Sequence, residues 1–403
     1  MKNLLKLFGI IILTAVIGFT LITCANGGGG GSGGGNNNAG GTVSGTPSDL
    51  QEFNDISAAE LVAKIKIGWN LGNTLDASPD ETSWGNPRTT KAMITAVKNA
   101  GFNAIRIPVS WHNATNSSYS IRANWMSRVV DIVNYAADND MYILLNTHHD
   151  EDIFKFTNDK KTQSLNAFGK IWGQIADTFK NYNEKLIFEA LNEPRTVGSP
   201  NQWSGGTAEE HENLNEHYRV FVETVRASGG NNGKRILMVS TYAASVEAPA
   251  VNGLVIPNDT NENSGVNKFI VSVHSYSPYN FALNENKSYN TWSKSNSSDT
   301  SPITTWVDRV YNRFVINGYP VIGGEFGALD KNNEAVRAEW AEYYVSYARS
   351  KGIPCFWWDD GGDFKFLNRS NNTFYFPAIR NALMSGVSGA LPPVIEPPSG
   401  DDD

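Results

Sequence analysis

Short apolar runs alternate with longer amphipathic stretches along most of the chain. The apolar runs have the length of β-strands and lie at 65–71, 104–109, 141–147, 186–190, 235–240, 269–274, 321–325 and 355–358. Between them, apolar residues recur near a 3.6-residue period, which predicts helices at 91–99, 125–137, 165–182, 208–227, 306–316 and 335–350. A glycine that can end a helix in the left-handed conformation follows four of these stretches, at Gly101, Gly229, Gly318 and Gly352.

Eight strand-to-helix units in this order predict a single α/β domain, a (β/α)8 barrel at residues 49–388. A doubly wound open sheet is the alternative fold. It is disfavoured because no Gly-x-Gly-x-x-Gly turn follows the first predicted strand. In a barrel of this kind, chemistry belongs at the carboxyl ends of the strands.

Polar residues gather at those predicted strand ends. They are Asn70, Asn73, Asp76, Arg106, Asn146, His148, His149, Asn192, Glu193, His274, Tyr276, Glu325, Trp358 and Asp359. Two of them, Glu193 and Glu325, are carboxylic acids that end separate apolar runs. Cleavage of a glycosidic bond requires such a pair, because one carboxyl protonates the leaving oxygen while the other attacks or activates water.

A nucleophilic carboxylate must stay ionised at neutral pH, and Arg106 and Tyr276 are the groups available to stabilise its charge. For Arg106 the structural alternative is a buried ion pair with Glu189, which lies deeper in the barrel. We favour a functional role for Arg106 and a structural one for Glu189. Asn192 precedes the predicted acid by one position, so it points away from the site unless Pro194 bends the strand there.

The segment from His148 to Asp152 has the composition of a metal site. Neighbouring residues on a strand point to opposite faces, however, and no spaced third ligand completes a set, so we predict neither a catalytic metal nor a cofactor. A structural calcium ion in the acidic loop stays open as an alternative. His211 and His217 fall on a polar predicted helix, where we expect them to be solvated.

The composition favours a neutral partner. The chain has 403 residues, and its formal net charge of −8 without a basic patch argues against nucleic acid. Aromatic residues make up 11% and several lie in Asn- and Ser-rich loops, where they can stack on sugar rings or cap the barrel rim. These include Trp84, Trp203 and the group Tyr276, Tyr279, Phe281, Tyr289 and Trp292. Long loops of this kind predict an open cleft that admits a chain in its middle.

The two ends of the sequence do not read as parts of the barrel. A basic start, an apolar stretch at 7–22 and Cys24 predict a signal peptide at 1–24, which resembles a bacterial lipoprotein signal with Cys24 as the lipidated residue. Thr23 departs from the usual small residue, so secretion without lipid is the alternative. Residues 25–48 are a predicted Gly/Asn-rich tether and 389–403 a Pro/Asp-rich tail or linker. The remaining cysteine, Cys355, is predicted to be a core residue.

Eight motifs occur in the same order as the predicted strands. They are GWNLGNTLD at 68–76, WGNP at 84–87, RIPVSW at 106–111, NTHH at 146–149, LNEP at 191–194, HSY at 274–276, GEFG at 324–327 and WWD at 357–359. In this order, from about residue 55 to 385, the chain resembles glycoside hydrolase family five. It most resembles the fourth subfamily, the bacterial endo-β-1,4-glucanases.

The resemblance implies a retaining endo-β-1,4-glucanase with Glu193 as acid/base and Glu325 as nucleophile. It further implies a sugar platform at Trp358, contacts to the non-reducing side from Asn73 and Asp76, and a substrate-binding surround of Arg106, His148, His149, Asn192, His274 and Tyr276. The partner is then a β-linked polysaccharide, the protein is expected to be a monomer, and a lipid anchor is its only expected link to a membrane. A xyloglucanase, lichenase, mannanase or xylanase of the same fold stays open. A non-catalytic carbohydrate-binding barrel is disfavoured because both acid positions are Glu.

Overall fold

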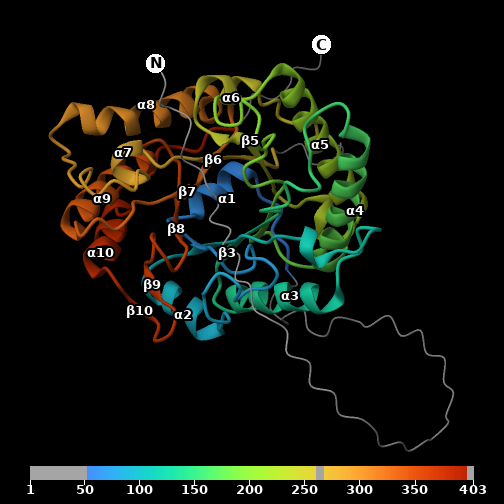
Figure 1. Ribbon diagram of the computed structural model, residues 1–403, viewed down its shortest axis with the longest axis horizontal. Coiled ribbons are helices and arrows are strands. Elements are labelled where there is room, and N and C mark those ends of the chain that lie inside the picture. The colour runs from blue at the N-terminus through green and yellow to red at the C-terminus, as the bar shows by residue number, and fades with distance from the viewer. Residues whose placement is uncertain (1–51, 260–266, 397–403) are drawn as a thin grey trace, which may run out of the picture. The chain divides into compact units, whose positions relative to one another are not determined.

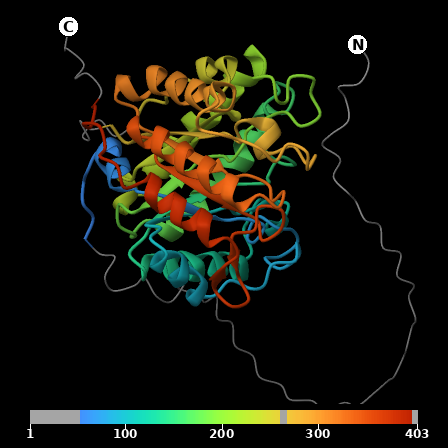
Figure 2. The same ribbon diagram turned by 90° about the vertical axis from the view of Figure 1, so that its left-hand side faces the viewer.

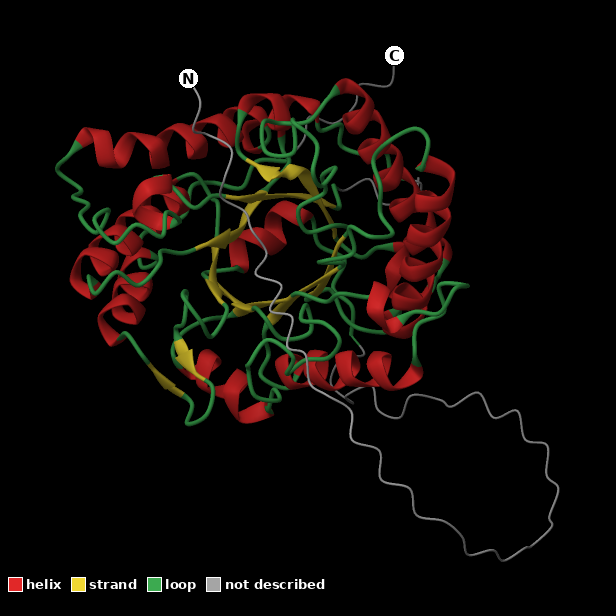
Figure 3. Cartoon of the chain, viewed as in Figure 1, coloured by secondary structure: helices red, strands yellow, loops and turns green. Residues whose placement is uncertain are grey.

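Eight parallel strands close into a barrel in sequence order, and Figures 1 and 3 show the ring that they form. The computed structural model describes residues 52–259 and 267–396, so Cys24 and the predicted tether lie outside the described residues. The strands are β1 Gly68–Leu71, β2 Ala104–Ile107, β3 Tyr142–Asn146, β4 Leu186–Glu189, β5 Leu237–Ser245, β6 Phe269–His274, β7 Val321–Phe326 and β8 Cys355–Asp359. The pairing of β8 with β1, with Trp357 opposite Trp69, completes the ring. The predicted (β/α)8 fold is confirmed.

Helices surround the barrel, and α9 and α10 pack side by side on its outside (Figures 1 and 2). The helices are α1 Ala58–Lys64, α2 Lys91–Asn99, α3 Ala123–Ala137, α4 Lys161–Phe179, α5 Ala208–Ala227, α6 Ala248–Gly253, α7 Tyr279–Ala282, α8 Ser297–Arg313, α9 Glu334–Ser350 and α10 Pro377–Gly386. Short 3-10 turns η1 His112–Ala114, η2 Gly230–Gly233 and η3 Val315–Asn317 and a small hairpin of β9 Leu367–Asn368 and β10 Thr373–Phe374 complete the described elements.

Two apolar layers hold the barrel together. One lies inside the ring, where Leu61 and Ile65 at the α1 end pack against strand residues such as Leu144 and Ile270. Because α1 covers this end of the barrel, seen within the ring in Figure 3, the opposite end is left for the loops that follow the strands. The second layer lies between strands and helices and includes Cys355, which is buried as predicted.

Local signals explain several helix ends. Thr207 begins α5 as a capping box with Glu210, in which each side chain accepts a hydrogen bond from the other residue's main-chain N–H. The glycines predicted to follow helices, Gly101, Gly229 and Gly352 among them, all have positive φ angles, between 73° and 107°. None of the described helices is long and apolar enough to cross a membrane.

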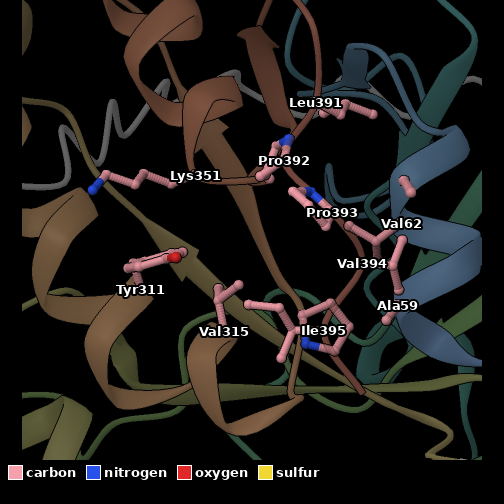
Figure 4. Close-up of a pocket in the computed structure, with 13 residues that line it drawn as sticks. Ala59, Val62, Tyr311, Val315, Lys351, Leu391, Pro392, Pro393, Val394 and Ile395 are labelled. Atoms are coloured by element: carbon pink, nitrogen blue, oxygen red, sulfur yellow. The ribbon is translucent and has the colours of Figure 1, made fainter.

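The first part of the predicted tail packs on the barrel. Residues 391–395 lie against Ala59 and Val62 of α1 and against Val315 of η3 (Figure 4). Ser57, the residue that caps α1, donates a hydrogen bond of 2.5 Å from its hydroxyl to Glu396. The segment therefore covers part of the barrel end that α1 closes, whereas 397–403 lie outside the described residues.

Candidate active site

Arg106 lies at the centre of the polar end of the barrel. Its side chain is fully buried, and its Nη1 donates to Glu325 at 2.7 Å while its Nε donates to Glu189 at 2.6 Å. Its Nη2 donates to Oδ1 of Asn192 at 2.7 Å. The guanidinium thus pairs with the deep carboxylate and with the strand-tip carboxylate, so the contacts of both interpretations occur together.

The two strand-tip acids lie close together. His274 Nδ1 is 3.0 Å from Oε1 of Glu193 and 3.6 Å from Oε2 of Glu325, and one oxygen of each carboxylate lies within 4.8 Å of the other. The Tyr276 hydroxyl donates to Oε2 of Glu325 at 2.9 Å. Retaining glycosidases separate their carboxyls by about 5 Å, whereas inverting enzymes need about 6.5 to 9.5 Å to admit a water molecule. The spacing fits the retaining arrangement.

The chain leaves strand geometry before it reaches Asn192 and Glu193. β4 ends at Glu189, and the Asn192 N–H donates across to the carbonyl of Thr147. Residues there no longer alternate between two faces as they do in a strand. Both side chains therefore reach the site, which the sequence allowed only if the strand bends. On β7, Gly324 leaves room for a neighbour: a Cβ at this position would lie 2.9 Å from Nε2 of His274.

Charge and burial set the protonation of this cluster. Burial lowers the pKa of Arg106, but the charges of Glu189 and Glu325 outweigh it and hold the pKa above its ordinary value, so the guanidinium stays charged. Burial and the charge of Glu325 raise the pKa of Tyr276 well above its ordinary value, which keeps the hydroxyl proton available for donation. Burial raises the pKa of Glu193, yet the hydrogen bond and charge of His274, with Arg195 and His149, leave it lower than usual.

His148 and His149 lie side by side, and the prediction that they point to opposite faces is wrong. β3 ends at Asn146, so the two residues follow the strand, and their rings meet edge to face at 4.5 Å. The His148 ring is parallel to Trp358 at 5.9 Å, and His149 contacts Trp84 at 5.7 Å. Burial lowers the pKa of His148 well below its ordinary value, so it is neutral at physiological pH.

Asp76 is buried beneath its loop and stabilises the loop's main chain. It has no exposed surface, and its two carboxylate oxygens accept the main-chain N–H groups of Asn73 and Thr74 at 2.9 and 2.6 Å. Asn73 itself is half-buried and has a left-handed φ of 52°. Asp76 therefore shapes the turn that presents Asn73.

Within the described ranges, two clusters bring three possible ligand atoms within 4.8 Å, namely Asp76 with His148 and His149, and Glu193 with His274 and Glu325. In the first, both oxygens of Asp76 are occupied by main-chain donors. In the second, Glu325 already has a counter-ion in Arg106. We assign no metal to either cluster.

Two histidines of α5 differ from their predicted environment. His217 is fully buried, with its ring nitrogens 2.7 Å from the Ser164 hydroxyl and from the carbonyl of Asn213, and burial lowers its pKa to about 4. Nε2 of His211 lies 2.7 Å from the carbonyl of Gly205. The expectation of solvation is wrong for His217, because α5 packs on α4 there, whereas His211 is half-buried.

The loop aromatics divide into two groups. Phe281 and Trp292 are core residues that are 4% exposed, whereas Tyr279 is 50% exposed and Tyr289 41%. Trp84 and Trp203 are also exposed, at 45% and 44%.

Arg195 was not singled out from the sequence. Its guanidinium lies over the Trp203 ring at 4.5 Å, and its Nη1 is 3.7 Å from Glu193 and its Nη2 3.3 Å from Glu151. The available signal was its place two positions after the predicted acid.

Comparisons with known proteins agree with this geometry. Residues 71–363 match the Cellulase family, glycosyl hydrolase family 5. Cellulase/esterase CelE of Acetivibrio thermocellus is 47% identical over 364 residues, covering 88% of this chain and 43% of that protein. Endoglucanase A of Clostridium longisporum is 41% identical over 374 residues, covering 88% of this chain and 71% of that protein. The chain thus spans less than half the length of the first of these relatives.

Solved structures give the same result. A GH5-4 broad specificity endoglucanase from Clostridium acetobutylicum superposes with a TM-score of 0.78 at 46% identity, covering 82% of this chain and 99% of that one. A GH5-4 broad specificity endoglucanase from Ruminococcus champanellensis, solved with bound cellotriose, gives a TM-score of 0.79 at 46% identity, covering 83% and 99%.

Proposed function

The chain belongs to glycosyl hydrolase family 5, and from this premise we propose that it is an endo-β-1,4-glucanase that cleaves cellulose-type β-glucans with retention of configuration. The observation that carries the proposal is the close pair of Glu193 and Glu325, with oxygens within 4.8 Å at the open end of the barrel. The similar endoglucanases, one of them with bound cellotriose, support the substrate class.

In the first step, the Glu325 carboxylate attacks the anomeric carbon while Glu193 gives its proton to the leaving glycosidic oxygen. Arg106 and Tyr276 orient Glu325 for this attack, because both donate hydrogen bonds to its carboxylate. The bond between the sugar and the leaving chain breaks as the bond to Glu325 forms. The product is a covalent glycosyl ester and a released chain end.

In the second step, Glu193 acts as a base. The negative charge of Glu325 is now consumed in the ester, and the acid has lost its proton to the first product. Glu193 removes a proton from water, which attacks the anomeric carbon and releases Glu325 as a carboxylate. His274, 3.0 Å from Glu193, orients that carboxyl in both steps.

The rim aromatics support cleavage within a chain. Trp84 and Trp203 are 45% and 44% exposed, and Trp358 stacks in parallel with His148 near the acids. Exposed aromatic side chains of this kind can stack on sugar rings on either side of the acids, as binding in the middle of a polysaccharide chain requires. A xyloglucanase or lichenase activity is the second candidate, favoured by similar proteins described as broad specificity endoglucanases and as a lichenase. Mannanase and xylanase activities remain alternatives, because they would use the same two acids.

A polysaccharide panel tests the proposal. We expect carboxymethyl-cellulose and mixed-linkage β-glucan to lose viscosity faster than reducing ends accumulate, with xyloglucan, mannan and xylan assayed beside them. Glu325→Ala serves as the inactive control. If only glucose or cellobiose were released at the earliest times, with viscosity unchanged, an exo-acting pocket would replace the open cleft.

We also propose that the protein is exported and lipid-anchored at Cys24, and that it is a monomer. The support for the anchor is the sequence alone, since Cys24 lies outside the described residues. Cys24→Ser should release soluble enzyme of unchanged specific activity. Mass spectrometry that finds wild-type protein without lipid would favour simple secretion, and light scattering tests the monomer.

A further inference from the structure

Arg195 and Glu151 form a charged pair beside the proposed acid. Nη1 of Arg195 is 3.7 Å from Oε2 of Glu193 and also donates to the Glu193 main-chain carbonyl at 2.8 Å. Nη2 of the same guanidinium is 3.3 Å from Oε1 of Glu151. The Arg195 side chain is only 12% exposed and its flat face lies over Trp203 at 4.5 Å, so the guanidinium is held in place.

We propose that Arg195 and Glu151 act as positioning residues that together set the pH range in which Glu193 delivers its proton. The inference rests on the proposed function, because it takes Glu193 as the general acid. One guanidinium is shared by two carboxylates, one of which must start the reaction protonated and one of which stays charged. The balance between them therefore controls how readily Glu193 keeps its proton.

The two charges act in opposite directions. Arg195 favours the ionised form of Glu193, which lowers the fraction of Glu193 that carries its proton at a given pH. Glu151 favours the protonated form, because it is a nearby negative charge and it draws on the same guanidinium. Burial raises the pKa of Glu151, but the hydrogen bond and charge of His149, with Arg195, outweigh it and leave the pKa at about 2. Glu151 is therefore negatively charged at neutral pH.

The other titratable or charged side chains around Glu193 are present in every variant compared below. They are His148 and His149 after β3, Arg106 on β2 through Asn192, His274 on β6, Tyr276 after β6 and Glu325 on β7. His148, Glu151 and Glu193 line one small pocket. Arg195 contacts Glu193 and Glu151 contacts Arg195, so we expect their effect to reach the substrate through Glu193.

The pH profile of kcat/KM on a soluble β-glucan tests the proposal with Arg195→Met and Glu151→Gln. A general acid is lost as pH rises through its pKa, so the alkaline side of the profile reports Glu193. Arg195→Met should move that side upward and Glu151→Gln should move it downward, each by about 0.5 to 1 pH unit for a partly exposed charge. The shift should be smaller for Glu151→Gln, because His149 also loses its counter-ion and is then less often protonated. The loss of positive charge at His149 raises the pKa of Glu193 and partly cancels the effect of the substitution.

Three controls separate charge from structure. Arg195→Lys keeps the positive charge and should keep the wild-type alkaline side even if kcat falls. Arg219→Met and Glu216→Gln make the same charge changes on the outer face of α5, where the two residues pair with each other, and should shift nothing. An aryl cellobioside with a good leaving group needs no proton in the first step, so its kcat/KM should show no shift in any variant.

Shifts in the same direction for Arg195→Met and Glu151→Gln, or no shift in either, would overturn the inference. So would an equal upward shift in Arg195→Lys, since that result assigns the effect to the hydrogen bond on the Glu193 carbonyl rather than to charge. These results are distinct from a failure of the proposed function. In that case the wild-type protein itself would not hydrolyse any β-glucan of the panel.

Discussion

Replacing Arg106 by Met should destabilise the barrel, because it removes the counter-ion of two carboxylates at once. The guanidinium and Glu189 have no exposed side-chain surface, and Glu325 is only 7% exposed. After the change, the donor left to Glu189 is the Ser272 hydroxyl at 2.8 Å, and Glu325 keeps Tyr276. Removing one partner of a buried ion pair costs about 3 to 5 kcal/mol of unfolding free energy, since a charge is left buried without compensation.

Equilibrium urea denaturation at neutral pH measures this loss, and Glu189→Gln is the matched variant. A Gln at 189 can still accept from Arg106, which also keeps Glu325 as its counter-ion, so the cost should be only about 1 to 3 kcal/mol. The double variant Arg106→Met with Glu189→Gln should lose less than the sum, by about 1 kcal/mol or more, because the two residues are in contact. A loss below about 1 kcal/mol for Arg106→Met, or strict additivity, would refute the argument that this pair is a stability element.

Four further predictions concern the reaction. An NMR time course should show the β anomer released first, because the oxygens of Glu193 and Glu325 lie within 4.8 Å, and the α anomer appearing first would reject the nucleophile assignment. Glu325→Ala should abolish turnover with an unchanged circular dichroism spectrum, whereas Glu193→Ala should keep activity on activated aryl glycosides and recover partly with azide; equal loss on aryl glycoside and polysaccharide would count against the acid role. Trp358→Ala should cost about 1 to 3 kcal/mol in kcat/KM, as other aromatic stacking contacts do, and a change within error would remove Trp358 from the sugar platform. A chelator should leave the rate unchanged, and a loss restored by added metal would show that the enzyme needs a bound metal, for which the two clusters of possible ligands are the first candidates.

Hydrophobic periodicity was enough to predict the barrel. The bounds of α2, α5 and β6 match the predicted ranges, because each element is bordered by clear polar or capping residues such as Thr207. Elements outside the alternating pattern were missed, namely α1, α6, α7, α10 and the β9–β10 hairpin. α8 begins at Ser297 rather than near 306, since Pro302 and a Ser- and Thr-rich first half resemble a loop in sequence. Tertiary packing decides such segments, and packing is not visible in a local pattern.

The site residues that could be predicted from the sequence are also those on the strands or at their ends. Residues on strands or at their tips, such as Arg106 and Glu325, were placed correctly at one end of the barrel because closure of parallel strands brings their carboxyl ends together. Residues beyond the tips obey loop geometry instead. His148 and His149 therefore meet although alternation separates them, and Asp76 turns inward to its own main chain. The pairing of Arg195 with a residue from the loop after β3 depends on where two loops cross, which no spacing along the chain encodes. The chemistry that adjusts the acid is thus the part of the site least accessible from the sequence, even though the acid itself is the easiest residue to find.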